Sequence, residues 1–178
     1  MLSNIQEKYE SLIKKREDLS QQLSARPSAV LCFKAGPDKW SIVDVIEHLV
    51  IAEQNLLEQL AANVPVSTLD PGTRTPKKHQ TVIKVMKRDI PVDVPDESLE
   101  PHGGLTLGEL CSQWDDIRKK LQGLLAEIKP ENEDDLVYRH PYGGPLDIAE
   151  TLYFIDVHFD NHMRQIDKIL AQSKMMVS

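Results

Sequence analysis

The sequence is poor in aromatic residues, which make up 5% of its 178 residues, and it contains only two cysteines. Its apolar residues are mainly Leu, Ile, Val and Ala, a composition that favours helices over a β-sandwich. Cys32 and Cys111 are isolated, with no Cys-x-x-Cys pair, so a disulfide framework is not expected.

Long apolar runs are also missing, since none approaches the ~20 residues that a membrane-spanning helix needs. Residues 1–15 contain no apolar segment typical of a secretory signal, so we expect a cytoplasmic protein with reduced thiols. The formal net charge of −7 argues against nucleic acid or a membrane as a partner. The length predicts a single domain, residues 1–178, that can bury one core.

Four long segments carry apolar residues at three- and four-residue steps, the period of a helix with one buried face. Two of them begin at clear capping signals: Ser41 with Asp44 three residues later, and Thr106 with Glu109. Pro145 suits the first position of the last helix. With no convincing strand, the sequence predicts an all-α helical bundle, its apolar stripes running over Ile5–Leu23 (with one turn skipped at Arg16), Ile42–Leu60, Leu107–Ile128 and Ile148–Leu170.

The connection between the second and third of these helices is unusually long. Residues 64–105 contain six prolines, and within them Lys77–Lys87 predicts a short helix. Residues 74–88 hold six Lys and Arg and no acid. A solvated basic face explains this segment most simply, and an anion-binding rim is the alternative.

Three histidines are candidate metal ligands. His158 and His162 are four residues apart, so on a helix they lie one turn apart on the same face. His48 occupies the same kind of position, at the edge of the apolar stripe of another helix. Three neutral imidazoles suit Zn²⁺, Ni²⁺, Cu²⁺ or Fe²⁺ and leave a coordination position open. Partly buried or exposed histidines without a metal are the alternative.

Other polar residues give weaker signals. Asp44, one turn before His48, could orient an imidazole or act as a base, although a capping role explains it equally well. His79 is expected to be exposed in the basic segment. His102 and His140 lie in turns rich in Gly and Pro, where a structural role is expected.

Two stretches resemble the motifs of the DinB-like superfamily. Residues 39–49, KWSIVDVIEHL, with Glu53 following, resemble the first motif, in which Trp-Ser opens a helix and a His precedes Leu. Residues 142–146, YGGPL, and 158–166, HFDNHMRQI, resemble the last motif, a His-x-x-x-His followed by Gln-Ile. The resemblance implies a four-helix bundle with a long crossover between helices two and three. It also implies a divalent metal on His48, His158 and His162, and a homodimer.

The sequence specifies the function of the protein less closely than its fold. Some members of that superfamily are thiol-dependent S-transferases, and others are related to metal-dependent hydrolases or isomerases. We therefore expect a low-molecular-weight-thiol S-transferase that acts on a small electrophile with Zn or Ni. A metal-dependent hydrolase and a non-catalytic, stress-related metal-binding module are the alternatives. Partners other than the small-molecule substrate or thiol and a second copy are not expected.

Overall fold

The computed structural model describes residues 1–64, 67–74, 76–88 and 96–175, and these are mostly helical. The helical class expected from the sequence is confirmed. The elements are α1 (Ser3–Ser24), α2 (Ser28–Leu31), α3 (Ile42–Asn63), η1 (Pro71–Thr73), α4 (Pro76–Lys87), η2 (Glu97–Leu99), α5 (Leu107–Glu127), η3 (Pro130–Asn132), β1 (Leu136–His140), β2 (Gly144–Asp147) and α6 (Ile148–Met175).

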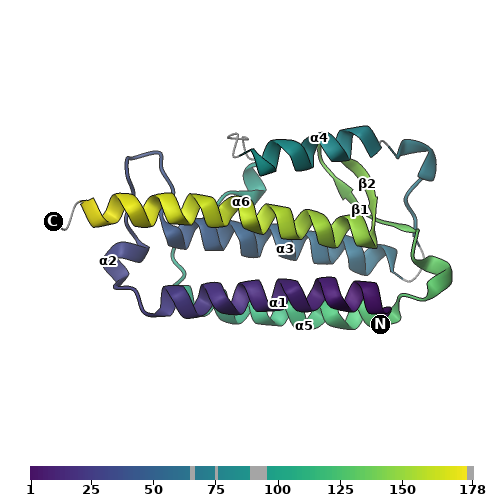
Figure 1. The fold of residues 1–178 in the computed structure, drawn as a ribbon, viewed down its shortest axis with the longest axis horizontal. Helices are drawn as coiled ribbons and strands as arrows, with labels where there is room; N and C mark the ends of the chain where they lie inside the picture. The colour runs from purple at the N-terminus through teal and green to yellow at the C-terminus, as the bar shows by residue number, and fades with distance from the viewer. Residues whose placement is uncertain (65–66, 75, 89–95, 176–178) are drawn as a thin grey trace.

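The four long helices, α1, α3, α5 and α6, lie side by side along the long axis of the molecule (Figure 1). Helix α3 packs on both α5 and α6, and α1 also packs on these two helices. Their apolar stripes meet in one core, in which Trp114 of α5 lies beside Phe159 of α6, with ring centroids 6.1 Å apart.

Both predicted capping signals form as expected. The Ser41 hydroxyl accepts from the backbone N–H of Asp44, whose carboxylate accepts from the backbone N–H of Ser41 at 2.7 Å. Thr106 and Glu109 make the same pair of bonds at the start of α5. Each pair satisfies backbone N–H groups that have no partner inside the helix, which fixes the residue at which the helix begins.

The expectation of no strand was wrong. Strands β1 and β2 pair antiparallel just before α6, with His140 opposite Gly144. Pro145 belongs to β2 and is not the first residue of the helix. Helix α6 instead begins after Asp147, whose Oδ1 accepts from the backbone N–H of Glu150 at 2.8 Å.

The turn of α1 that the apolar stripe skips is filled by a buried arginine. Arg16 donates to the backbone carbonyl of Cys111 at 2.9 Å and pairs with Asp115 at 2.7 Å, both on α5. The long aliphatic part of an arginine can cover apolar surface while its guanidinium binds polar groups at the edge. The gap in the pattern is therefore a polar link between two helices.

The long connection between α3 and α5 contains α4, which packs on α6 beside the hairpin (Figure 1). The predicted short helix is confirmed, and Ile83 is its buried anchor. Arg164 of α6 donates to the backbone carbonyl of Met86, and Lys87 donates to the hydroxyl of Tyr153 at 2.6 Å. These contacts hold the end of α4 against the middle of α6.

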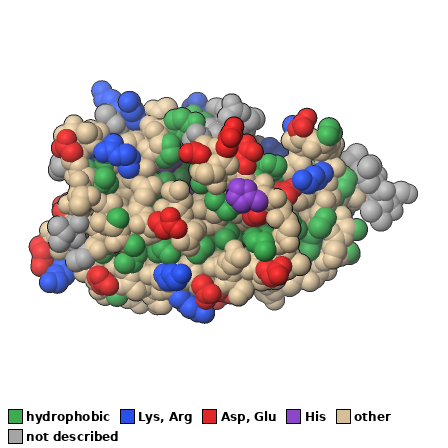
Figure 2. Space-filling view, turned by 180° about the vertical axis from the view of Figure 1, so that it is seen from behind, with side chains coloured by type: hydrophobic (Ala, Val, Ile, Leu, Met, Phe, Trp, Pro, Cys, Tyr) green, Lys and Arg blue, Asp and Glu red, His purple; other side chains and the backbone are tan. Residues whose placement is uncertain are grey.

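In the part of the chain that the structure describes, no helix is both long and apolar enough to cross a membrane. The face opposite to that of Figure 1 carries hydrophobic side chains across its middle, with acidic and basic side chains interspersed around them (Figure 2).

Candidate metal centre

The three candidate histidines converge between α3 and α6. Nε2 of His158 lies 3.4 Å from Nε2 of His48 and 3.1 Å from Nε2 of His162. The ring centroids of His48 and His162 are 4.8 Å apart. The structure thus brings together the three residues that the sequence predicted as ligands, and their nitrogen atoms all lie within 4.8 Å of one another.

The other nitrogen of two of these rings faces an oxygen. Nδ1 of His48 lies 2.8 Å from the backbone carbonyl oxygen of Leu99, and Nδ1 of His162 lies 2.8 Å from Oε1 of Gln165. Because a carbonyl oxygen only accepts, each Nδ1 carries the proton and donates it. Both Nε2 atoms therefore present lone pairs toward His158, the tautomer that a metal ligand needs.

The two separations to His158 fit nitrogens that share one metal ion. Two nitrogens bound to the same Zn²⁺ at about 2.0–2.1 Å and at a tetrahedral angle lie about 3.3 Å apart. The two separations to His158 bracket that value. Three imidazoles bound to one ion would occupy three of its four tetrahedral positions, which would leave the fourth open to a further ligand.

The histidines are also in the right protonation state. Burial lowers the pKa of His48, and it lowers the pKa of His162 to about 4. Burial lowers the pKa of His158 well below its ordinary value, and the neighbouring imidazoles lower it further. All three rings are therefore neutral at pH 7, and a neutral imidazole is the form that binds a metal.

Aromatic rings support two of the histidines from outside. Trp40, directly before the cap of α3, packs on His48 with ring centroids 5.0 Å apart. Phe154, one turn before His158 on α6, stacks on its ring at 5.5 Å. These contacts limit the rotation of the imidazoles and keep the site partly dry, while His158 remains half-buried rather than fully enclosed.

Asp44 makes its bonds at the start of α3. Its Oδ2 accepts from the Ser41 hydroxyl and pairs with Nζ of Lys34, both at 2.8 Å. Burial alone would raise the pKa of Asp44, but the hydrogen bonds from Lys34 and Ser41 outweigh it and hold the pKa below its ordinary value. Among the described residues no hydrogen bond joins Asp44 to a histidine. Its capping role is confirmed, and its role at the metal stays a prediction.

The remaining histidines lie outside this cluster. His79, expected to be exposed, is buried where α4 packs on α6, because α4 turns it inward with Ile83. His102 is exposed, as a loop residue. His140 has the structural role expected of it: its Nδ1 accepts from the backbone N–H groups of Tyr142 and Gly143 at 3.0 and 2.8 Å.

One buried acid near the centre was not singled out by the sequence. Glu47, directly before His48, is 4% exposed, and its two carboxylate oxygens accept the backbone N–H groups of His102 and Gly103 at 3.1 and 2.9 Å. In the sequence, an acidic residue between apolar helix positions looks like a side chain that is exposed to solvent. Only the return of a distant loop, residues 96–104, makes Glu47 a buried acceptor.

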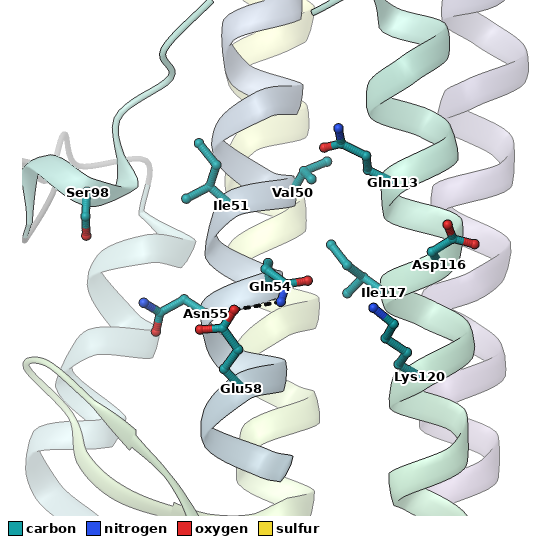
Figure 3. Close-up of a pocket in the computed structure, with 10 residues that line it drawn as sticks. All are labelled: Val50, Ile51, Gln54, Asn55, Glu58, Ser98, Gln113, Asp116, Ile117 and Lys120. Atoms are coloured by element: carbon teal, nitrogen blue, oxygen red, sulfur yellow. Dashed lines mark hydrogen bonds between the residues drawn. The ribbon is translucent and has the colours of Figure 1, made fainter. Parts of the chain in front are cut away.

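A groove of about 450 Å³ lies between α3 and α5, with Ser98 at its edge (Figure 3). Val50, Ile51 and Ile117 supply its apolar lining, and a hydrogen bond of 2.8 Å joins Gln54 to Glu58 within it. None of the three clustered histidines lines this groove. It is therefore distinct from the metal centre, although the residue after Ser98 supplies the carbonyl that His48 contacts.

Comparison with known proteins agrees with these observations. A family model described as the DinB superfamily matches residues 11–166, a range that includes all three histidines. Neither the curated proteins nor the solved structures compared with the chain gave a match. The family match spans most of the sequence, including the helices that carry the histidine cluster. This chain therefore belongs to the DinB superfamily.

Proposed function

We propose that this protein binds one divalent transition metal ion, Zn²⁺ or Ni²⁺, through Nε2 of His48, His158 and His162. A single observation carries the proposal: the Nε2 lone pairs of His48 and His162 both face Nε2 of His158. The one ring proton of neutral His158 can satisfy at most one of them. A cation satisfies all three nitrogens at once, which explains why buried, neutral imidazoles are held so close together.

We further propose that the site serves an enzyme, with transfer of a low-molecular-weight thiol to a small electrophile as its reaction. When bound, such an ion supplies Lewis acidity, which lowers the pKa of a thiol or a water that shares it. His48, His158 and His162 would hold the ion, and Trp40 and Phe154 would shield the site from bulk water. The sulfur forms a bond to the electrophilic carbon, the leaving group departs with its electron pair, and the thiol proton passes to solvent.

The basic segment suits recognition of the thiol. Lys84, Lys87 and Arg88 are exposed at the end of α4, and this end is tied to α6 at Arg164, two residues beyond His162. Exposed positive charge there favours a thiol that carries carboxylates. A charge reversal, Lys84→Glu, should raise KM for such a thiol and leave KM for an uncharged thiol unchanged.

We also interpret the four long helices as the expected four-helix bundle, with the α3–α5 connection as its crossover. The resemblance to the superfamily supports a homodimer and a cytoplasmic location as further proposals. Light scattering of the purified protein would test the oligomeric state.

Metal content tests the first proposal most directly. Protein purified without an affinity tag should contain about one metal ion per chain by elemental analysis, and His158→Ala should contain much less. His102→Ala is the matched control, because it removes an exposed histidine outside the cluster. Equal metal content in wild type and His158→Ala would refute the proposed centre.

A measurement of catalytic turnover tests the second proposal, that the protein is a thiol transferase. The metal-loaded protein, offered a model electrophile and a series of thiols, should form the conjugate faster than His158→Ala does. Release of a hydrolysed product without any added thiol would instead support a metal-dependent hydrolase.

A non-catalytic metal-binding module is the second candidate. It is favoured by the position of the groove between α3 and α5, which none of the three histidines lines. On that reading the metal stabilises the fold and no substrate reaches it. Full metal content together with conjugate formation no faster than in His158→Ala would support this candidate.

A further inference from the structure

We infer that Glu47 is a positioning residue of the proposed metal centre. It holds the loop of residues 96–104, and this loop in turn fixes the orientation and tautomer of the His48 imidazole. This inference rests on the proposed metal function and assigns a residue to it. Glu47 and His48 are consecutive on α3, and both contact this one loop. The imidazole donates to the carbonyl of Leu99, and the carboxylate accepts from two N–H groups a few residues later.

The carboxylate of Glu47 accepts two backbone hydrogen bonds from the loop, and we call this pair of bonds the clamp. Oε1 accepts from the N–H of His102 at 3.1 Å and Oε2 accepts from the N–H of Gly103 at 2.9 Å, so both oxygens are used on one short stretch of backbone. The side chain is 4% exposed. Hydrogen bonds to an ionised carboxylate are stronger than neutral ones, and a buried carboxylate without such donors would be costly.

The loop is shaped to offer these donors. Gly103 has φ +76° and Gly104 has φ +93°, the left-handed conformation that glycine adopts with least strain. This turn directs the N–H groups toward α3. On the other side of the loop, Asp96 caps η2 by accepting from the N–H of Ser98 at 2.8 Å. The carbonyl of Leu99 thus lies in a segment that is fixed at both ends.

Fixing Leu99 fixes the tautomer of His48. While the carbonyl stays 2.8 Å from Nδ1, the ring proton stays on Nδ1 and Nε2 keeps its lone pair for a metal. Without the clamp the loop can move away from α3, and the ring proton is free to move to Nε2. Glu47 therefore acts on the metal centre through His48 and contacts no metal itself.

The experiment compares Glu47→Gln with wild type. The amide of glutamine accepts one N–H and turns its own NH₂ toward the other donor, so one arm of the clamp is lost. In metal-free protein, the ring ¹⁵N chemical shifts of His48 should show the Nδ1–H tautomer in wild type and a mixture of tautomers in Glu47→Gln. Zinc affinity, titrated with Zn²⁺ alone, should fall about tenfold, as when a supporting hydrogen bond of a metal ligand is lost.

Thr106→Ala is the matched control. It removes the two hydrogen bonds that the Thr106 hydroxyl makes with Glu109 at the start of α5, at the far end of the same connection, and among the described residues no hydrogen bond joins Thr106 to α3. Its melting temperature should fall, with the ¹⁵N pattern of His48 and the zinc affinity unchanged. A purely structural role of Glu47 would lower the melting temperature alone. Wild-type ¹⁵N shifts in Glu47→Gln would overturn the inference.

The two proposals can fail separately. If wild type binds neither zinc nor nickel, the proposed metal function is refuted, while the ¹⁵N comparison of metal-free proteins still decides the role of Glu47. If Glu47→Gln does not fold, Gly103→Ala replaces it, because a Cβ there meets no atom within 4 Å and disturbs only the turn that presents the N–H. The same change of tautomer is then expected, and its absence would refute the role of the clamp.

Discussion

Glu53 of α3 and Arg118 of α5 form an ion pair inside the helical core, with Oε1 and Nη2 2.6 Å apart and the side chains 5% and 2% exposed. The backbone carbonyl of Arg118 also accepts from the hydroxyl of Tyr9 on α1 at 2.9 Å. Three helices therefore meet at polar groups that water does not reach.

Replacing only one partner of this ion pair should strongly lower the free energy of unfolding. Arg118→Met leaves the carboxylate of Glu53 buried without its partner, which typically costs about 3–5 kcal/mol of unfolding free energy. Urea denaturation would measure the loss. In the double variant Glu53→Leu/Arg118→Met neither charge remains, so much of the stability should return. Lys119→Met, an exposed neighbour in a weak pair with Asp116, should change stability little, and an equal loss there would contradict the explanation.

Zinc should stabilise the fold, because only the folded chain brings its ligands together. At a free zinc concentration 100 times Kd, the unfolding free energy should rise by about 2.7 kcal/mol. Thermal melts with zinc and with a chelator would measure this difference. In His162→Ala the difference should nearly vanish, and a zinc-dependent rise in Tm of wild-type size in that variant would place the ion elsewhere.

Stability should fall as the pH falls from about 7 to 4. Burial, with a smaller effect of His79, lowers the pKa of His140 to about 4, whereas an unfolded histidine has a pKa of about 6.5. Between these values the unfolded chain binds a proton that the folded chain does not. The stability that His140 contributes is thus complete above the unfolded pKa and is lost as the pH falls.

His140→Asn isolates this contribution. Asparagine can accept from the N–H groups of Tyr142 and Gly143 but does not titrate. Between pH 7 and 5 the variant should lose about 2 kcal/mol less unfolding free energy than wild type, as measured by urea denaturation at each pH. Parallel curves for the two proteins would show that His140 is not held neutral by burial.

Two glycine substitutions should change the free energy of unfolding in opposite directions. A Cβ on Gly143 would lie 3.3 Å from Cβ, Cγ and Nδ1 of His140, whose ring is held from another side by Phe154 at 4.5 Å. Gly143→Ala should therefore destabilise by about 1–3 kcal/mol. Gly123 is exposed inside α5, four residues before the last residue of the helix, and a Cβ there meets nothing within 4 Å, so Gly123→Ala should stabilise by about 1 kcal/mol. Thermal melts of both variants would show the contrast.

The sequence predicts the helices and the three histidines well because these signals are local. The caps at Ser41 and Thr106 each involve residues three apart, and the pair His158 and His162 follows from the helical repeat alone. His48 was placed beside them because it lies at the edge of another apolar stripe and because the resemblance to the superfamily points to the same three residues.

Other features depend on contacts between distant segments. Strands β1 and β2 have five and four residues, too few for an alternating pattern to stand out, and Pro145 is compatible with either a strand edge or a helix start. His79 was expected to be exposed, Arg16 was seen only as a gap in an apolar stripe, and Glu47 was not singled out. Each is buried because a segment distant in the sequence packs over it, and the residues around it in the sequence do not predict that contact.

The spacing of the proposed ligands along the chain has a consequence for biosynthesis. His48 and His158 are 110 positions apart, so the ribosome adds all the residues between them after His48 before both proposed ligands exist. A nascent chain that ends before α6 has one ligand and cannot capture an ion at this centre. If the proposed ion binds, loading must therefore follow the emergence of α6 from the exit tunnel, and a chain truncated before α6 should bind no ion at these residues.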